Sequence, residues 1–383
     1  MSAIGKYALL LLLIGNLASQ YVPFNPIAGI IFYGTLVLGA MYCIYNCKGL
    51  FIKDNIKAAS FIFVFVAMYL LYQFTFGLFY IEKISLMYLA AKITVLLIIF
   101  WGITLYYEFY YHKIIPYLSI TIAILIVYGL FFHNYIIHGR FTLGFGNPNS
   151  TSAIAAIGFA AFLLIKMPSK YISIAGVIIC LFGVLAGGSR ASIMVCMIAL
   201  FFKYRFSVKT VVLIIGCLFV ALYIIPMTGY KVIGLDRIMD VFANGNFVGS
   251  RQDVRRATMM MINEHPVIGW GLRTGIQGEA AKLTTMGAHN GYLDTIKAIG
   301  YPYAAILFGA CIYIFYRMRL LFKEKSPYVK FHLFVIISVL LAAMYESYII
   351  GVNQIITNLL FVSVAVLEYR CYYNIQDEDT EEH

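Results

Sequence analysis

Residues 287–307 read GAHNGYLDTIKAIGYPYAAIL and join polar, titratable side chains to a long apolar run. His289, Asn290, Asp294 and Lys297 all lie in the first half of this stretch. In a membrane, an ionisable group is costly and marks a functional position, whereas in water it needs no such explanation. The solvent that surrounds the chain therefore decides how the stretch is interpreted.

The composition indicates a membrane protein. Of the 383 residues, 62% are hydrophobic and 12% are charged, whereas soluble domains carry about 25% charged residues. Apolar runs of roughly 20 residues, the length of a spanning helix, number about twelve. Their centres lie near residues 12, 36, 68, 95, 124, 158, 179, 197, 217, 309, 340 and 361. We therefore expect an all-α polytopic membrane protein, with residues 1–383 forming a single integral membrane domain.

Basic residues are concentrated at the ends of the predicted spans, and their distribution predicts the orientation. With the N-terminus inside, the short loops of the outer side hold only Lys83, Arg140 and Arg190. Cytoplasmic loops are enriched in Lys and Arg, so both termini are predicted to be cytoplasmic, including an acidic tail at 371–383. The net charge of +11 thus reflects orientation, and we expect no nucleic-acid partner, because the charges form no single stripe.

The first apolar run, YALLLLLIGNLASQ at residues 7–20, has features of a signal peptide, with one Lys before it and small residues after it. Because many further spans follow, we expect a retained first helix instead.

One loop on the outer side is far longer than the others. It covers residues 227–298, and loops of this length are usually functional. Within it, residues 250–266 (SRQDVRRATMMMINEHP) place apolar side chains on one helical face, which is interrupted only by Thr258. Arg251 and Arg255 are four residues apart and border this face together. We expect an amphipathic helix that lies at the outer membrane interface and presents both arginines at headgroup depth.

Arginine residues near helix starts are candidate phosphate ligands. Arg190 follows Gly-Gly-Ser and directly precedes the eighth predicted span, where unpaired backbone N–H groups favour an anion. Arg251 could add a bidentate guanidinium, which fits phosphate oxygens better than Lys does. Arg140 and Arg255 are further candidates on the same side. The simpler alternative is that these side chains only extend to the membrane surface, but their shared location on one side favours binding.

His289 opens the tenth predicted span, where the helix dipole favours a neutral ring that can act as a general base. Asn290 is a candidate for orienting a sugar. Asp294 or Lys297 either supports the ring or merely solvates the helix start. Glu346 is expected in the outward half of the eleventh span, either as a functional group or as a structural partner of an arginine. No spacing of His, Cys or carboxylates indicates a metal site.

Three motifs, in this order, resemble those of the O-antigen ligase and O-antigen polymerase superfamily of bacterial membrane glycosyltransferases. They are a Ser-Arg at a span start in GGSRAS (187–192), an Arg before a Pro-x-x-Gly-x-Gly in PVIGWG (266–271), and a His-Asn opening the next span in AHNGYL (288–293). The resemblance covers roughly residues 140–365. Earlier residues resemble nothing beyond hydrophobic spans, so the acceptor stays open.

The resemblance implies a C-type glycosyltransferase in the bacterial inner membrane, with the long loop and the active site in the periplasm. The donor would be a glycan on undecaprenyl pyrophosphate, and the acceptor would be a lipid-linked repeat unit or lipid A core. His289 resembles the general base, and Arg190 and Arg251 resemble the pyrophosphate ligands. The scheme requires no metal and no cofactor. Membrane lipids and a chain-length regulator are further expected partners.

Within this superfamily, the compact length and the element GRFTLGFGNPNSTSA (139–153) favour a polymerase over a ligase. A flippase or another transporter is an alternative, but the two halves show no repeat and most ionisable residues lie at span ends. A scaffold without chemistry would leave the arginines and His289 unexplained.

Overall fold

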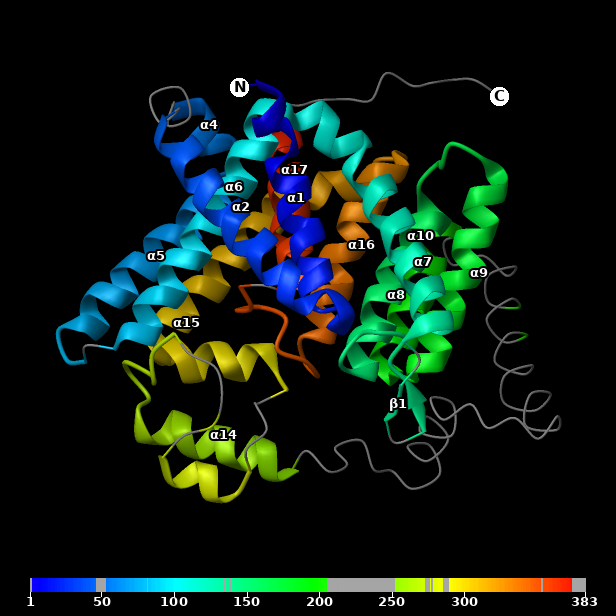
Figure 1. Cartoon of the computed structure of the whole chain (residues 1–383). Coiled ribbons are helices and arrows are strands. Elements are labelled where there is room, and N and C mark those ends of the chain that lie inside the picture. Colours follow the sequence, from blue (N-terminus) through cyan, green and yellow to red (C-terminus); the bar gives the residue numbers. More distant parts are fainter. Residues whose placement is uncertain are drawn as a thin grey trace. The chain divides into compact units, whose positions relative to one another are not determined.

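Helices dominate the structure (Figure 1). The computed structural model describes residues 2–45, 53–80, 82–133, 135–137, 139–204, 212, 216, 252–272, 276, 278–284, 289–352 and 354–373. In this part of the chain, the named strands are β1 (Ile136–Ile137) and β2 (Arg140–Phe141), an antiparallel hairpin with Ile136 opposite Phe141. The all-α class is thus confirmed.

Six helical segments within the described residues are long and apolar enough to cross a membrane. They are α5 (Ser60–Gly77), α6 (Lys83–His112), α7 (Ile114–Phe132), α9 (Lys170–Gly187), α15 (Gly291–Arg317) with η5 (Met318–Lys323), and α17 (Ile355–Tyr373). Shorter apolar helices lie within α1 (Ser2–Ser19), α2 (Asn25–Tyr45), α8 (Pro148–Leu164) and α16 (Pro327–Ala342). The chain is a multi-pass membrane protein.

The predicted span centres can be compared with these helices one by one. Each centre falls within one of them or within α10 (Arg190–Tyr204), except the centre near residue 217, which lies outside the described residues. The complete set of spans and its orientation therefore stay predictions. The remaining elements are the short helices η1 (Val22–Phe24), α4 (Lys53–Ala58), α14 (Gln252–Glu264) and η4 (Gly278–Lys282).

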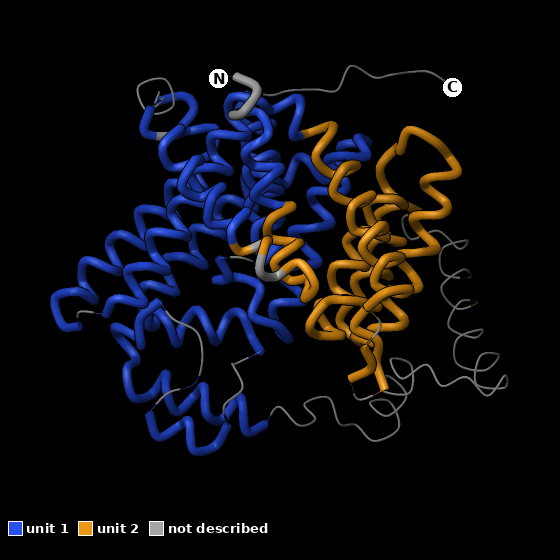
Figure 2. The backbone as a smooth tube through the Cα atoms, viewed as in Figure 1, with its two compact units in different colours: residues 1–13, 30–110, 250–383 blue, residues 14–29, 111–249 orange. Residues whose placement is uncertain are grey.

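The chain forms two compact units, each assembled from segments that are distant in sequence (Figure 2). Unit 1 consists of residues 1–13, 30–110 and 250–383. Unit 2 consists of residues 14–29 and 111–249. The candidate site residues are divided between the two units. His289 and Glu346 belong to unit 1, and Arg140 and Arg190 belong to unit 2.

In unit 1, α17 is almost completely buried. The rings of Phe61 and Phe65 on α5 lie 5.6 and 5.0 Å from the ring of Phe361 on α17, and such aromatic pairs contribute about 0.5–1.5 kcal/mol each beyond their buried area. On the other side, the Tyr72 hydroxyl of α5 donates to the Ala298 carbonyl of α15 at 2.7 Å. These contacts hold α15, the helix that His289 precedes, against the rest of the unit.

The helix α15 is bent at Gly300, whose φ is 76°. Pro302, two residues later, lacks the N–H that a continuous helix would use. A Cβ at Gly300 would overlap the Val267 carbonyl oxygen, and the freed Tyr301 N–H donates to the Pro266 carbonyl at 2.8 Å. The bend therefore makes room for the residues that follow α14.

Unit 2 contains a bundle of α7, α8, α9 and α10, in which α8 is almost completely buried. Its interior uses small residues to bring helices together. A Cβ at Gly158 would lie 2.8 Å from the Cys180 sulfur, and one at Gly183 would lie 3.0 Å from the Ala155 Cβ. Close approach through small residues is the usual way in which membrane helices associate.

Candidate active site

His289 lies just before α15, and its backbone adopts an uncommon conformation. Its φ is +46°, a left-handed geometry that few residues other than Gly adopt. Such conformations persist where the surroundings enforce them, and they cluster at functional sites. The next residue, Asn290, caps α15, because its side-chain oxygen accepts from the N–H groups of Tyr292 and Leu293 at 3.1 and 3.0 Å. This N-cap fixes the backbone that carries the imidazole.

The carboxylate of Glu346 faces the imidazole of His289. Its Oε2 lies 3.2 Å from His289 Nδ1, and the two side chains are 17% and 32% exposed, respectively. When Nδ1 carries the proton and donates a hydrogen bond to the carboxylate, Nε2 keeps a free lone pair. A base oriented in this way by a carboxylate can accept a proton from a hydroxyl group.

Glu346 does not lie in a helix, so the expectation that a helical eleventh span contains it was wrong. The helix α16 ends at Ala342, and residues 343–352 belong to an irregular segment before α17 (Figure 1). The Gly291 N–H donates to the carbonyls of Ala343 and Glu346 at 2.7 and 3.1 Å. The segment thus takes part of its hydrogen bonding from the start of α15, which a continued α16 would not allow. The imidazole of His289 lies beside this carboxylate.

Residues 290 and 291 clamp this irregular segment. The Asn290 amide donates to the Met344 carbonyl at 3.0 Å. A Cβ at Gly291 would lie 3.1 Å from Ile349 Cγ1 and 3.3 Å from the Glu346 carbonyl oxygen, so a larger residue would push the segment away. The His-Asn-Gly sequence therefore has a structural role at its second and third positions. A contact between Asn290 and a sugar stays a prediction.

The Pro-x-x-Gly-x-Gly motif attaches α14 to α15. The N–H groups of Trp270 and Gly271 donate to the carbonyls of Lys297 and Ala298 at 2.9 and 3.0 Å, next to the bend in α15. The Trp270 indole N–H donates to the Met261 carbonyl of α14 at 2.7 Å. The motif thereby links the helix of the long loop to the helix that follows His289.

The predicted amphipathic helix is present as α14, but protein covers its apolar face. Ala257 and Met261 form a small core with Ala280, and Trp270 packs against it. Thr258, the polar interruption, is also buried and donates its hydroxyl to the Val254 carbonyl at 2.8 Å. The expectation that this face lies in the membrane interface is therefore wrong, because residues from the same loop occupy it.

The structure describes one of the two candidate arginines of the long loop, Arg255, but not the other, Arg251. Arg255 is exposed on α14, as is its neighbour Arg256. Arg251 lies outside the described residues. The ability of Arg251 and Arg255 to bind phosphate therefore stays a prediction.

In unit 2, Arg140 connects three elements at one end of the helical bundle. Its Nε donates to the Gly187 carbonyl at the end of α9 at 2.7 Å. Its Nη2 donates to Asn149 Oδ1 in the first turn of α8 at 2.6 Å, and Asn147 caps that helix. Two of its three guanidinium nitrogens thus bind protein, so its clearest role is to shape this end of the bundle.

Arg190 is the first residue of α10, as the sequence predicted. Gly188, with a φ of 61°, ends α9, and the Ser189 N–H donates to the Ser152 hydroxyl at 3.2 Å. This bond and the one between Arg140 and Gly187 hold the turn between α9 and α10. Arg190 is partly buried. Its position at a helix N-terminus suits an anion, and its role as a phosphate ligand stays a prediction.

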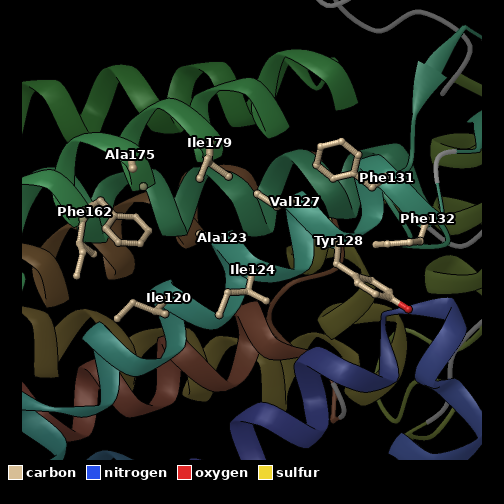
Figure 3. Close-up of a pocket in the computed structure, with 12 residues that line it drawn as sticks. Ile120, Ala123, Ile124, Val127, Tyr128, Phe131, Phe132, Phe162, Ala175 and Ile179 are labelled. Carbon is tan, nitrogen blue, oxygen red and sulfur yellow. The ribbon is translucent and has the colours of Figure 1, made fainter.

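An apolar groove runs along the same bundle (Figure 3). Its volume is about 460 Å³. The lining residues come from α7, α8 and α9; they are Ile120, Ala123, Ile124, Val127, Tyr128, Phe131, Phe132, Phe162, Ile172, Ala175, Gly176 and Ile179. Along α7 the groove extends to Phe132, the last residue before the segment with the β1–β2 hairpin and Arg140. An apolar chain bound there would end near a polar part of the bundle.

Two residues that were not predicted from the sequence contact the segment that carries Glu346. Lys92, fully buried in α6, donates to the Gly351 carbonyl at 2.8 Å and lies 4.4 Å from the centroid of the Phe361 ring. A lysine inside an apolar run is itself a signal of function or structure, so it could have been found. Ser347, which donates its hydroxyl to Asp294, gave no such signal.

These features define a multi-pass membrane protein with a His–carboxylate pair in one unit and, in the other, Arg140 and Arg190 at one end of the helical bundle. Residues 175–308 match the family model described as O-antigen ligase. The matched region includes Arg190, α14 and His289, and the resemblance to the O-antigen ligase and polymerase superfamily is confirmed over it. The family implies a glycosyltransferase of ligase or polymerase type that acts on lipid-linked glycans. None of the curated proteins searched matches the chain.

Proposed function

We propose that the chain is a polymerase that joins undecaprenyl-pyrophosphate-linked oligosaccharide repeat units into O-antigen or a related surface polysaccharide. The reaction takes place at the periplasmic face of the bacterial inner membrane. The observation that carries the proposal is the distance of 3.2 Å between His289 Nδ1 and Glu346 Oε2, within a pair that is still partly exposed. A buried and closed pair could not receive an acceptor.

In the proposed reaction, His289 Nε2 accepts the proton of an acceptor sugar hydroxyl. The hydroxyl oxygen forms a bond to the anomeric carbon of the donor glycan. The bond between that carbon and the pyrophosphate oxygen breaks, and the lipid pyrophosphate leaves with the electron pair. Glu346 stabilises the imidazolium that forms. General-base assistance of this kind accelerates reactions by about 10² to 10⁴-fold.

The leaving pyrophosphate needs positive charge. In the proposal, Arg190 and Arg251 bind its oxygens and Arg255 is a further ligand. Arg140 acts indirectly, because its bonds to Gly187 and Asn149 shape the turn that precedes Arg190. Hydrogen-bond donors that face developing negative charge stabilise the transition state most when their positions are fixed before the reaction.

The carrier lipid also has a long isoprenoid tail. We assign this tail to the apolar groove on α7, α8 and α9, because Arg140 contacts the end of α9 and Arg190 begins the next helix, α10. A lipid phosphate at these arginines could then place its hydrocarbon chain on the same bundle.

A ligase that transfers the finished glycan to lipid A core is the second candidate, because the matched family model is described as O-antigen ligase. The two activities share the donor and differ in the acceptor. A flippase for lipid-linked glycans is a more distant alternative.

The surface polysaccharide of a deletion strain, separated on a gel, distinguishes these functions. Loss of a polymerase leaves core carrying one repeat unit, whereas loss of a ligase leaves bare core and lipid-linked polymer. Loss of a flippase leaves bare core without that polymer. We expect the first pattern, and we expect it to persist when His289→Gln is expressed at the wild-type level. Restoration of long chains by His289→Gln would contradict the mechanism.

A further inference from the structure

Asp294 and Lys297 form a buried ion pair in the first turns of α15. Lys297 Nζ lies 2.8 Å from Asp294 Oδ1, and the side chains are 2% and 7% exposed, respectively. Neither side chain can therefore serve to solvate the helix start. Removing two charges from water is costly, and a buried ion pair is often no more stabilising than apolar residues of the same size. The pair therefore suggests a role other than stability.

The second carboxylate oxygen of Asp294 connects the ion pair to the segment that carries Glu346, the residue beside the candidate base His289. Oδ2 accepts the hydroxyl hydrogen of Ser347, and Ser347 directly follows Glu346 in the chain. The backbone of Glu346 is also held, since its carbonyl accepts from the Gly291 N–H at 3.1 Å. Lys297, Asp294 and Ser347 thus form a continuous network that ends one residue from the carboxylate beside His289.

We propose that Asp294, fixed by Lys297, positions Glu346 through Ser347 and thereby orients the His289 imidazole for proton transfer. The inference rests on the proposed glycosyltransferase function. Asp294, Lys297 and Ser347 are positioning residues, because the contacts described for them lead to Glu346 and not to the imidazole. Catalytic groups must be held within about 0.5 Å of the productive geometry by side chains that are themselves fixed. Among the described residues, the helical hydrogen bonding of α16 continues as far as the Glu346 N–H, which donates to the Ala342 carbonyl at 3.0 Å. This bond holds the backbone of Glu346 but not its side chain, so the carboxylate needs further contacts to be fixed.

A simpler role for Asp294 would be to complement the dipole of α15 in its first turn. An exposed aspartate would serve that purpose without a buried lysine and without Ser347. The two roles predict different results. A residue that only stabilises the helix changes the amount of folded protein, whereas a residue that positions the base changes kcat in the protein that is folded.

The variant Ser347→Ala tests the network with little disturbance, because it leaves the ion pair intact. The full-length protein in detergent is assayed with lipid-linked repeat units extracted from the deletion strain. We expect kcat to fall about tenfold, as is usual when an outer partner of a catalytic group is removed, with little change in KM. Ser347→Thr keeps the hydroxyl and should restore kcat. The matched control is Ser338→Ala, which removes a buried hydroxyl that has no partner among the described residues.

A double-mutant cycle distinguishes positioning from independent stabilisation. If Ser347 acts through Glu346, Ser347→Ala should cost nothing further in a Glu346→Gln background. A second variant, Asp294→Leu combined with Lys297→Met, replaces the ion pair with apolar residues and avoids an unpaired buried charge. It should fold and show the same loss of kcat.

Three results would overturn the inference. The first is full kcat in Ser347→Ala, and the second is full kcat in the variant that combines Asp294→Leu with Lys297→Met. The third is that Ser347→Ala lowers kcat by the same factor in the Glu346→Gln background as in the wild-type protein. If His289→Gln is inactive in the same assay, these results leave the proposed function intact. Absence of turnover by the wild-type protein would instead overturn the proposed function, and this inference with it.

Discussion

Two carboxylates of unit 1, those of Glu368 and Glu346, differ in how much of the side chain the surrounding protein covers. Glu368 on α17 accepts the Phe61 N–H at 2.8 Å and the Ser60 hydroxyl, and Arg317 lies 3.7 Å away. Its side chain is 3% exposed. Glu346 is 17% exposed and faces an imidazole that is 32% exposed. One carboxylate is surrounded by donors from the protein, and the other shares a partly open position with a titratable ring.

The difference shows that residue type alone does not identify a reactive carboxylate. A buried carboxylate with several donors fixes the elements around it, and removing it leaves those donors without a partner. A carboxylate that orients an accessible histidine can assist proton transfer. We therefore interpret Glu368 as structural and Glu346 as part of the chemistry.

The largest expected effect is that of His289→Gln. Glutamine can still form a hydrogen bond with Glu346, but it has no nitrogen that titrates. We expect turnover to fall about 10² to 10⁴-fold, or roughly 3 to 5 kcal/mol of barrier, with an unchanged unfolding midpoint. Turnover is measured in purified protein at matched concentration. A variant that keeps most of its activity would make the His289–Glu346 pair as structural as the Glu368 cluster.

The next largest effect concerns Arg190 and Arg370, which differ, like the two carboxylates, in how far the protein buries them. Arg190 is partly buried at a helix start, whereas Arg370 is 2% exposed and is bound to Glu324 at 2.8 Å. We expect Arg190→Ala to reduce kcat/KM about 10²-fold, because a donor to developing charge is lost. Arg190→Lys should recover only part of it, because the guanidinium fork is lost.

Two controls accompany this prediction. Arg370→Ala should reduce the amount of folded protein and leave turnover per folded molecule unchanged. Arg256→Ala, which removes an exposed charge from α14, should change little. Equal and mild effects at all three positions would mean that Arg190 only extends to the membrane surface.

A smaller effect is expected at Asn290, where stability and chemistry can be separated. Asn290→Ala removes the N-cap of α15 and should destabilise the protein by about 1 kcal/mol, as measured by thermal unfolding in detergent. Asn290→Ser should restore the cap. If the Ser variant is stable but has a higher KM for the acceptor, Asn290 contacts a sugar as well. If both stability and KM return to normal, its role is structural alone.

The smallest effect is expected in the apolar groove of unit 2. Ala175 is exposed on the lining of α9, and Ala175→Trp should obstruct the groove without removing a hydrogen bond. We expect KM for a donor with a full-length isoprenoid tail to rise about fivefold, roughly 1 kcal/mol. A donor analogue with a short tail should be unaffected. An equal change for both donors would indicate that the groove does not bind the tail.

The sequence predicted the parts of this protein that depend on local composition. Span positions follow from runs of apolar residues, the start of α10 at Arg190 from Gly-Gly-Ser, and the helix over 252–264 from its periodicity. The motif that contains His289 was recognisable for the same reason.

The features that the sequence did not predict depend on contacts between distant residues. The segment that carries Glu346 is held by Gly291, about 50 residues earlier. The cover of the α14 apolar face comes from Ala280 and Trp270, and Ser347 meets Asp294 across 53 positions. No local pattern records such pairings, because they depend on the way the helices pack.

The most direct test of the account is a crossed measurement on Glu346→Gln and Glu368→Gln. Both variants remove one charge and keep the shape of the side chain, and both are assayed for turnover and thermal unfolding in the same detergent. We predict that Glu346→Gln loses turnover about 10 to 100-fold with an unchanged unfolding midpoint. Glu368→Gln should lose about 2 kcal/mol of stability with unchanged turnover per folded molecule. If Glu346→Gln is fully active, or if it loses stability as Glu368→Gln does, Glu346 has no part in the chemistry and the distinction between the two carboxylates is wrong.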